Sequence, residues 1–202
     1  TRVTAVEESE DKSARGDEDM TQETQSAITP EVKAMIGVSG DIVESWGYVD
    51  TEYLRRFTQA VMDPDPRYWD EEFAKSTQYG GVITPPIMVS YMASRVPPNT
   101  PDPITKAFEE DPMSDGIGRV ERLGSLPRVP TDLVRVLNAG NELEIYQYPS
   151  IGDKIFFQNK YSDIRERVGR DGKPFLIVTT ETTYRNQKEE VLCITRASSI
   201  RR

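Results

Sequence analysis

The chain contains no histidine in its 202 residues and only one cysteine, Cys193. Without imidazole there is no Ser-His-Asp triad, no Cys-His pair and no histidine-ligated zinc. A single cysteine also excludes a disulfide framework and a thiolate metal cluster. We therefore expect no metal site, and we expect a reducing, cytoplasmic location.

Clustered positive charge and long apolar runs are also scarce. The 25 Lys and Arg residues are outnumbered by 34 Asp and Glu residues, which gives a net charge of -9. Binding to nucleic acid or to an anionic membrane needs clustered Lys and Arg, so neither is expected as a partner. The longest uncharged apolar stretch, residues 82–92, is too short to span a bilayer.

The acidic residues concentrate at the start of the chain. Residues 1–27 hold three basic and eight acidic side chains and almost no large apolar ones. Such a composition cannot offset the entropy cost of folding, so residues 1–27 are predicted to be a disordered acidic tail. Residues 28–202 are then expected to form one domain, with an irregular Pro-rich excursion at about 96–130 that contains at most a short helix at residues 104–109.

Helical patterns fill the first half of this domain. Asp50 is a suitable N-cap for an apolar stripe that extends from Tyr53 to Val61, and residues 63–66, Asp-Pro-Asp-Pro, must form a stiff turn. Thr84 followed by two prolines predicts the capped start of a second helix. That helix, residues 87–93, is apolar nearly all round and is expected to be buried.

Strand patterns fill the second half. Residues 141–148, 154–168, 175–186 and 191–200 are rich in β-branched and aromatic residues and are separated by turn sequences. Four strands in hairpin succession predict an antiparallel meander. The expected fold is of the α+β class, with the sheet wrapped around the apolar helix.

Two motifs resemble the amino-terminal domain of MaoC-like dehydratases, the hot-dog-fold enoyl-CoA hydratases. They are residues 62–70, Met-Asp-Pro-Asp-Pro-Arg-Tyr-Trp-Asp, and residues 79–86, Tyr-Gly-Gly-Val-Ile-Thr-Pro-Pro. Residues 138–144 and 150–153 stand where that family has a His-Gly-Gly segment and a Pro-Gly-Asp turn. Residues 178–186 are similar to its closing strand, so the resemblance covers roughly residues 35–200 and implies a hot-dog fold.

The chain departs from the family at the catalytic motif, Gly-Asp-x-Asn-Pro-x-His, whose Asp and His hold the reacting water. Asp63 keeps the Asp position, Asp65 stands at the Asn position and Tyr68 stands at the His position. A phenol with a pKa of about 10 is a much poorer base near neutral pH than an imidazole at about 6.5. The resemblance therefore implies a degenerate, non-catalytic domain in which Asp63 and Tyr68 are only weak catalytic candidates.

The family further implies how such a chain serves an enzyme. It resembles the degenerate half of an (R)-specific enoyl-CoA hydratase or 3-hydroxyacyl-CoA dehydratase, made as a separate substrate-binding subunit. A smaller MaoC-like subunit would supply the catalytic Asp and His in a heterodimer or heterotetramer. No cofactor is expected beyond the coenzyme A thioester substrate, which would belong to lipid, steroid or aromatic-acid catabolism.

Several residues are candidates for binding that substrate. The glycine pair at 80–81 offers backbone N–H groups to a thioester oxygen, or else forms only a tight turn. The substrate-binding candidates are Asp65, Gly80, Gly81, Thr84, Asn138 and Gly140, and the candidates for the coenzyme A phosphates are Arg165, Arg167 and Arg170. The three arginines equally fit a solvated hairpin tip.

Two other functions fit the same residues. One is an acyl-CoA-binding or assembly module without turnover. The other is a stand-alone hydratase that uses Asp63 and Tyr68. Activity of the isolated chain and of its complex separates these possibilities.

Overall fold

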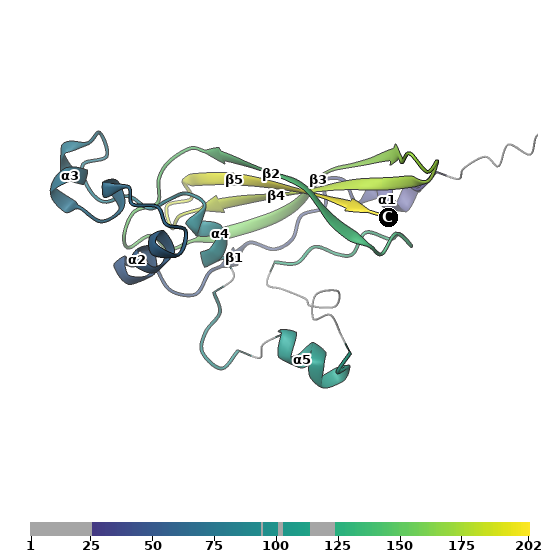
Figure 1. Cartoon of the computed structure of the whole chain (residues 1–202), viewed down its shortest axis with the longest axis horizontal. Helices are drawn as coiled ribbons and strands as arrows, with labels where there is room; N and C mark the ends of the chain where they lie inside the picture. Colours follow the sequence, from purple (N-terminus) through teal and green to yellow (C-terminus); the bar gives the residue numbers. More distant parts are fainter. Residues whose placement is uncertain (1–25, 94, 101–102, 114–123) are drawn as a thin grey trace, which may run out of the picture.

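The computed structural model describes residues 26–93, 95–100, 103–113 and 124–202. A five-stranded antiparallel sheet extends along the molecule, with α2 and α3 beyond one end of it and α5 to one side (Figure 1). The helical elements are α1 (Pro30–Ala34), α2 (Thr51–Ala60), the 3-10 turn η1 (Pro66–Tyr68), α3 (Glu71–Ser76), α4 (Met88–Met92) and α5 (Pro103–Glu110). The strands are β1 (Val43–Glu44), β2 (Val136–Ile145), β3 (Phe156–Val168), β4 (Pro174–Arg185) and β5 (Val191–Arg201).

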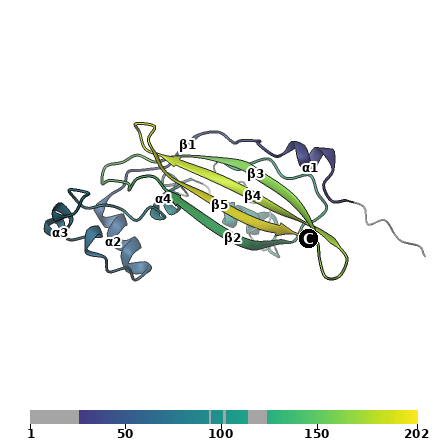
Figure 2. The ribbon, with the colours of Figure 1, turned by 90° about the horizontal axis from the view of Figure 1, so that it is seen from above.

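The strands are ordered β1-β3-β4-β5-β2, as Figure 2 shows from above. The predicted four-strand meander is therefore wrong in one respect: β3, β4 and β5 follow one another, but β2 pairs with β5 at the far edge. The chain after β2 crosses back over the end of the sheet, held by the bridge between Ile83 and Ser150 and by the hydrogen bond from the Thr84 N–H to the Pro149 carbonyl, 3.0 Å. The β3 edge is taken instead by β1 and by the bridge between Ser39 and Lys160.

The two ends of the sheet are far apart. Strand β3 spans twelve residue steps from Phe156 to Val168, which at about 3.3 Å per residue is about 40 Å. Helix α4 packs at the Phe156 end, and the β3–β4 hairpin forms the opposite end. A residue on that hairpin is therefore remote from anything built around α4.

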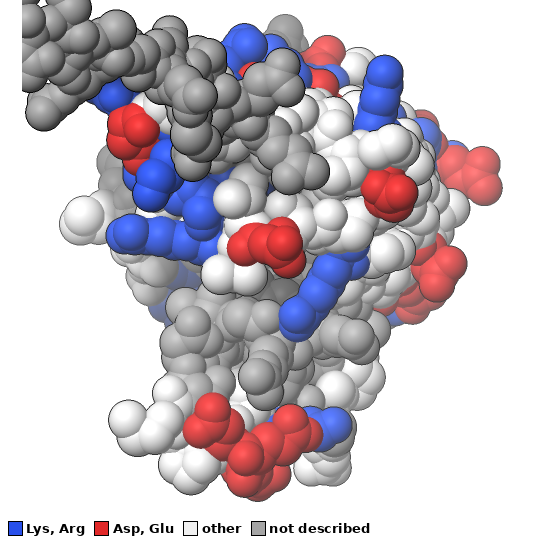
Figure 3. Space-filling model, turned by 90° about the vertical axis from the view of Figure 1, so that its right-hand side faces the viewer, with Lys and Arg blue, Asp and Glu red and all other residues white. Residues whose placement is uncertain are grey.

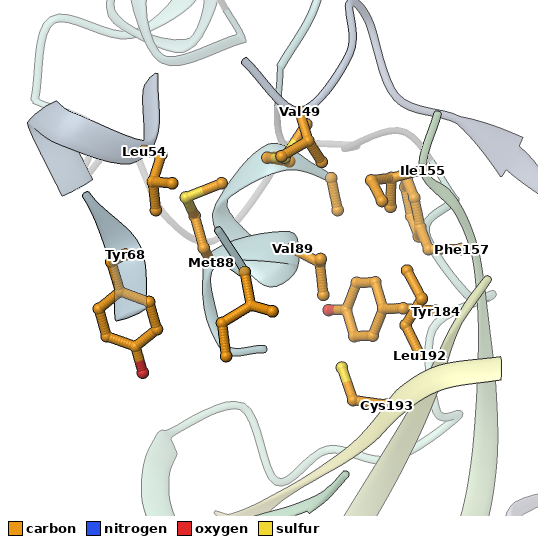
Figure 4. Close-up of a cluster of buried hydrophobic side chains, with 13 residues drawn as sticks. Val49, Leu54, Tyr68, Met88, Val89, Ile155, Phe157, Tyr184, Leu192 and Cys193 are labelled. Carbon is orange, nitrogen blue, oxygen red and sulfur yellow. The ribbon is translucent and has the colours of Figure 1, made fainter. Parts of the chain in front are cut away.

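Helix α4 is shorter and less enclosed than expected. Met88, Val89 and Met92 are buried, but Tyr91 is 57% exposed and Ile87, just before the helix, is 39% exposed. Its buried side packs on side chains of β3, β4 and β5 in the main core cluster, drawn in Figure 4. The members from the strands are Phe157, Tyr184, Leu192 and Cys193. Cys193 is buried as a small core residue, as predicted, and burial raises its pKa to about 12.

A second core cluster covers the other end of the sheet, where the sequence offered no covering helix. Val32 of α1 packs against Tyr161, Ile164 and the β4 residues Leu176 and Val178. Segments 27–38 and 126–133 supply the remaining contacts through partly buried side chains. The apolar helix therefore covers only one end of this face of the sheet, and the other end is covered by α1 and by segment 126–133.

The local prediction for α2 is confirmed. The Asp50 carboxylate accepts a hydrogen bond from the Tyr53 N–H at 2.7 Å and caps α2, which ends at Ala60 before the proline turn. Helix α5 agrees within one residue at each end with the short helix expected at 104–109. Residues 1–25 of the expected tail lie outside the described residues, whereas Ser26 and Ala27 contact Glu166 of β3.

The described residues include no helix long and apolar enough to cross a membrane.

Candidate functional site

A cavity of about 1050 Å³ lies between α2 and the turn that follows it. One wall is the inner side of α2, with Leu54 and Thr58, and the opposite wall is built from Asp63, Tyr68 and Gly81. The loop at Ser150 and Ile151 contributes as well. Leu54 and Tyr68 also belong to the main core cluster, which places the cavity at the α4 end of the sheet.

The wall at residues 63–68 is a rigid, self-bonded turn. The Asp63 carboxylate accepts a hydrogen bond from the Asp65 N–H at 3.2 Å. The Asp65 carboxylate accepts hydrogen bonds from the Arg67 backbone N–H at 2.9 Å and from the Arg67 guanidinium, Nε to Oδ2 at 2.9 Å. The guanidinium lowers the pKa of Asp65 through these hydrogen bonds. Asp65 is thus committed to Arg67 and does not line the cavity, so the structure does not support it as a substrate-binding residue.

Tyr68 is the chemically informative residue of this wall. Its side chain is buried, and desolvation raises its pKa above the ordinary 10, with a further upward contribution from the charges of Asp63 and Asp65. The phenol therefore stays protonated at neutral pH. Tyr68 can donate a hydrogen bond into the cavity but is unsuited to remove a proton from water. The structure does bring together Asp63 and Tyr68, the two weak catalytic candidates.

The two glycines differ in what their backbone offers. Gly80 has a φ of +69°, and its N–H donates to the Thr77 carbonyl at 3.1 Å, so this donor is already used. Gly81 lines the cavity, and a Cβ added there would meet no atom within 4 Å. Only Gly81 of the pair is placed to approach a ligand, and the tight turn expected as the alternative is present at Gly80.

Thr84 does not cap α4. The Met88 N–H donates a hydrogen bond to the Pro85 carbonyl, and the Val89 N–H donates to the Pro86 carbonyl. The two prolines therefore form the turn that leads into α4, as expected. The Thr84 side chain is fully buried, and its Oγ1 has no hydrogen-bond partner among the described residues. The predicted cap is wrong because the residue is drawn into the core by its backbone bond to Pro149. Thr84 is not among the residues that line the cavity.

Asn138 and Gly140 lie on the exposed strand β2. Asn138 accepts the Gly140 N–H at 3.1 Å across a β-bulge, and it pairs with Ser199. Seven residues separate it from Ile145, which pairs with Cys193 beside α4, a distance of about 23 Å along the strand. Within one chain the structure therefore does not bring Asn138 or Gly140 to the cavity.

Arg165, Arg167 and Arg170 are at the hairpin end of the sheet. Arg165 forms an ion pair with Asp163 at 2.5 Å, and Arg167 pairs with Phe175 near the tip. Arg165 is about 30 Å of strand away from the α4 end, and the hairpin tip is about 40 Å away. The three arginines therefore lie at the hairpin end of the sheet and do not line the cavity within one chain, and their predicted contact with the coenzyme A phosphates stays a prediction.

Sequence reasoning missed part of the wall contributed by α2. Thr58 interrupts the apolar stripe of that helix, and its hydroxyl donates to the Leu54 carbonyl at 3.0 Å. A small polar residue one turn after a core leucine is a weak indication of a face that borders a cavity. The rim also carries Arg55, bonded to Glu52 at 2.6 Å, and Lys75, bonded to Glu71 at 3.4 Å.

No group of three or more Asp, Glu or Cys side chains within the described ranges is arranged to hold a metal ion. The site therefore offers hydrogen-bond donors, the carboxylates of Asp63 and Glu71, and apolar walls.

An α+β fold with a sheet against a short central helix, and a cavity bordered by the Asp63–Tyr68 turn, define a hot-dog protein of the dehydratase type. The chain belongs to this family: residues 35–195 match the model of the FAS1-like dehydratase domain region. The structural comparisons agree, and the predicted MaoC-like hot-dog fold is confirmed.

The individual relatives are distant. A UPF0336 protein of Saccharopolyspora erythraea is 27% identical over 154 residues, which covers 76% of this chain and 81% of that protein. The ChsH1-ChsH2 complex of Mycobacterium tuberculosis contains a chain with a TM-score of 0.60 at 14% identity, covering 85% of this chain and 86% of that one. A chain of the HadBC (3R)-hydroxyacyl-ACP dehydratase complex of the same organism gives a TM-score of 0.52 at 18% identity, covering 82% and 96%.

Proposed function

We propose that this chain is the substrate-binding, non-catalytic subunit of a cytoplasmic heteromeric enzyme that hydrates enoyl thioesters or dehydrates 3-hydroxyacyl thioesters with (R)-specificity. Family membership supports the reaction class. The catalytic Asp and His would come from a smaller MaoC-like partner subunit. Coenzyme A is the proposed carrier of the acyl group.

The observation that carries this proposal is the state of Tyr68. In the family motif the corresponding residue is the histidine that holds the reacting water. Here the position is a buried phenol with a raised pKa, and the chain has no histidine that could replace it. A base that is fully protonated at neutral pH cannot activate water at a useful rate.

The exposed edge of the sheet supports a partner subunit. All ten residues of β2 are exposed, and β2 pairs only with β5 among the described strands. The apolar side chains on this strand include Val136, Leu137, Leu143 and Ile145. An edge strand that has one free edge and exposed apolar side chains is suited to pair with a strand of another chain. The two structural relatives from M. tuberculosis are themselves complexes of two different chains.

The dimensions of the cavity support a bulky acyl group. Its volume of about 1050 Å³ is at the upper end of ordinary ligand sites, about 300–1000 Å³. Helix α4 has only five residues, so the chain turns away from the sheet into the excursion soon after Met92. In the proposed complex, Tyr68 and the backbone of Gly81 would donate hydrogen bonds to the thioester, while Leu54 lines its apolar part.

Activity measurements on defined assemblies test the proposal. The chain is purified alone and together with a histidine-containing MaoC-like subunit of the same organism, and hydration of crotonyl-CoA and of a long-chain enoyl-CoA is followed. We expect no turnover by the chain alone and turnover by the complex. Robust hydration by the isolated chain would contradict the non-catalytic role.

Calorimetric binding of acyl-CoA separates the remaining possibility. An inactive complex that still binds acyl-CoA would identify a binding or assembly module without turnover. A complex that retains activity when the catalytic Asp and His of the partner are replaced would assign the chemistry to this chain instead.

A further inference from the structure

The end of the sheet farthest from the cavity carries several Lys and Arg side chains, with acidic side chains between them (Figure 3). We call it the basic end; its basic members are Arg135, Arg165, Arg167, Arg170, Lys173, Arg201 and Arg202. Strand pairing gathers them, because Arg167 lies opposite Phe175, and Arg201 opposite both Leu176 and Val136. Glu31 and Asp132 adjoin residues of the second core cluster at the same end. The acidic side chains of β3 and the β3–β4 hairpin there are Asp163, Glu166 and Asp171.

Each of these three carboxylates already has a partner. Asp163 pairs with Arg165 at 2.5 Å, and Asp171 pairs with Arg202 at 3.2 Å. Glu166 accepts hydrogen bonds from Ser26 and Ala27.

The other basic side chains therefore lack a counter-charge. No ion pair within the described residues involves Arg135, Arg167, Arg170 or Lys173. The Nε of Arg201 is buried and has no hydrogen-bond partner there. The basic end consequently has the capacity to bind several anionic groups.

The chain enters the described structure at this same end. Glu166 holds Ser26 and Ala27, and Ala27 packs with the neighbouring core cluster. Residues 1–25 carry three basic and eight acidic side chains. Glu23 is three residues from Ser26, a span of at most about 10 Å, and Asp17 is nine residues away, at most about 30 Å. Carboxylates of the segment can therefore reach the basic end.

We propose that the acidic segment 1–25 binds to the basic end of its own chain. Tethering gives the segment an effective concentration in the millimolar range, so a separate acidic protein of similar charge would have to exceed that concentration to displace it. The segment thus neutralises the basic end and competes with any anionic partner there. The binding is electrostatic and must weaken as salt shortens the Debye length.

Paramagnetic relaxation on the full-length chain tests this proposal. A nitroxide is attached at Ser9→Cys, while the buried Cys193, whose thiol is raised to a pKa of about 12, stays unlabelled. Amide intensities of the hairpin, residues 165–173, are compared with those of α3. The reference is a nitroxide-labelled variant in which the eight carboxylates of residues 7–23 are replaced by amides. At about 10 mM salt we expect the hairpin amide intensities of the acidic chain to be at least about twofold lower than those of this reference. At about 1 M salt, where the Debye length is about 3 Å, this difference should disappear.

Two matched variants keep the outcome decisive. The triple change Arg167→Gln, Arg170→Gln and Lys173→Gln should remove the effect, whereas Arg56→Gln, Lys75→Gln and Lys106→Gln, at exposed sites away from the basic end, should leave it. Equal hairpin intensities with the acidic and the amide segment would overturn the proposal. A mixed sample, in which one copy carries the nitroxide and another carries the isotope label, tests for binding between copies. The same loss of hairpin intensity in that mixture would also overturn the proposal, because the segment would then bind a second copy.

Discussion

The guanidinium of Arg95 lies over the ring of Tyr53, 4.7 Å from its centroid, and so connects the exit of α4 to the first turn of α2. The same guanidinium is 5.3 Å from the Trp46 ring and 3.7 Å from the Asp50 carboxylate that caps α2. Its side chain is only 22% exposed. One residue therefore holds together three segments that form the α4 end of the molecule.

Replacing Arg95 with Met keeps the apolar stem and removes the charge. We expect the free energy of unfolding to fall by about 1–2 kcal/mol, since a half-buried cation over aromatic rings contributes roughly that amount. Urea unfolding measures the change. The matched variant is Arg56→Met, whose side chain is 72% exposed beside Glu52, and it should cost less than about 0.5 kcal/mol. Equal losses at both positions would refute the role of Arg95.

The ion pair between Asp65 and Arg67 predicts a pH dependence of stability. The pKa of Asp65 is lowered in the folded chain, so the pair stabilises the fold above the unfolded pKa of about 4. This contribution is lost as the pH falls through the lower, folded pKa. The Asp65→Asn variant should therefore be less stable than the native chain at pH 7, and the two should converge as the pH falls below the folded pKa of Asp65.

Unfolding in urea at several pH values follows this convergence. Arg67→Gln removes the guanidinium and should weaken the same pH dependence, while the backbone N–H of residue 67 still donates to the Asp65 carboxylate. If the free energies of unfolding of the native chain and of Asp65→Asn differ by the same amount at every pH, the carboxylate contributes through its shape and not through its charge.

The sequence predicted what depends on neighbours in the chain. The Asp50 cap, the helix up to Ala60 and the strand patterns of β3 to β5 follow from local periodicity and hydrogen bonding, and all appear in the structure. The position of β2 could not be predicted, because the choice between the edges of β3 and β5 is made by distant contacts of the loop at Pro149. The distance of Arg165 from the cavity could not be predicted for a similar reason, since a sequence pattern does not show that a thirteen-residue strand extends between the two ends of the sheet.

Thr84 offers a second test of stability. Its buried hydroxyl has no partner among the described residues, so Thr84→Val, which keeps the shape, should leave the free energy of unfolding unchanged or raise it by up to about 1 kcal/mol. Thr179→Val is the matched control. The Thr179 hydroxyl is bonded to that of Ser198 at 2.9 Å, and its removal should cost about 1–2 kcal/mol. A comparable loss at Thr84 would reveal a hydrogen-bond partner for its hydroxyl.

Tyr68 distinguishes binding from catalysis in the proposed complex. If its protonated phenol only orients the thioester, Tyr68→Phe should raise KM by about two- to tenfold, the value of one hydrogen bond, and change kcat by less than about twofold. If the phenol moved a proton, kcat would instead fall by about a hundredfold or more. Steady-state kinetics of the complex with an enoyl-CoA substrate decide between the two. Because the raised pKa holds the phenol in its protonated form throughout the neutral range, a change confined to KM is the expected result.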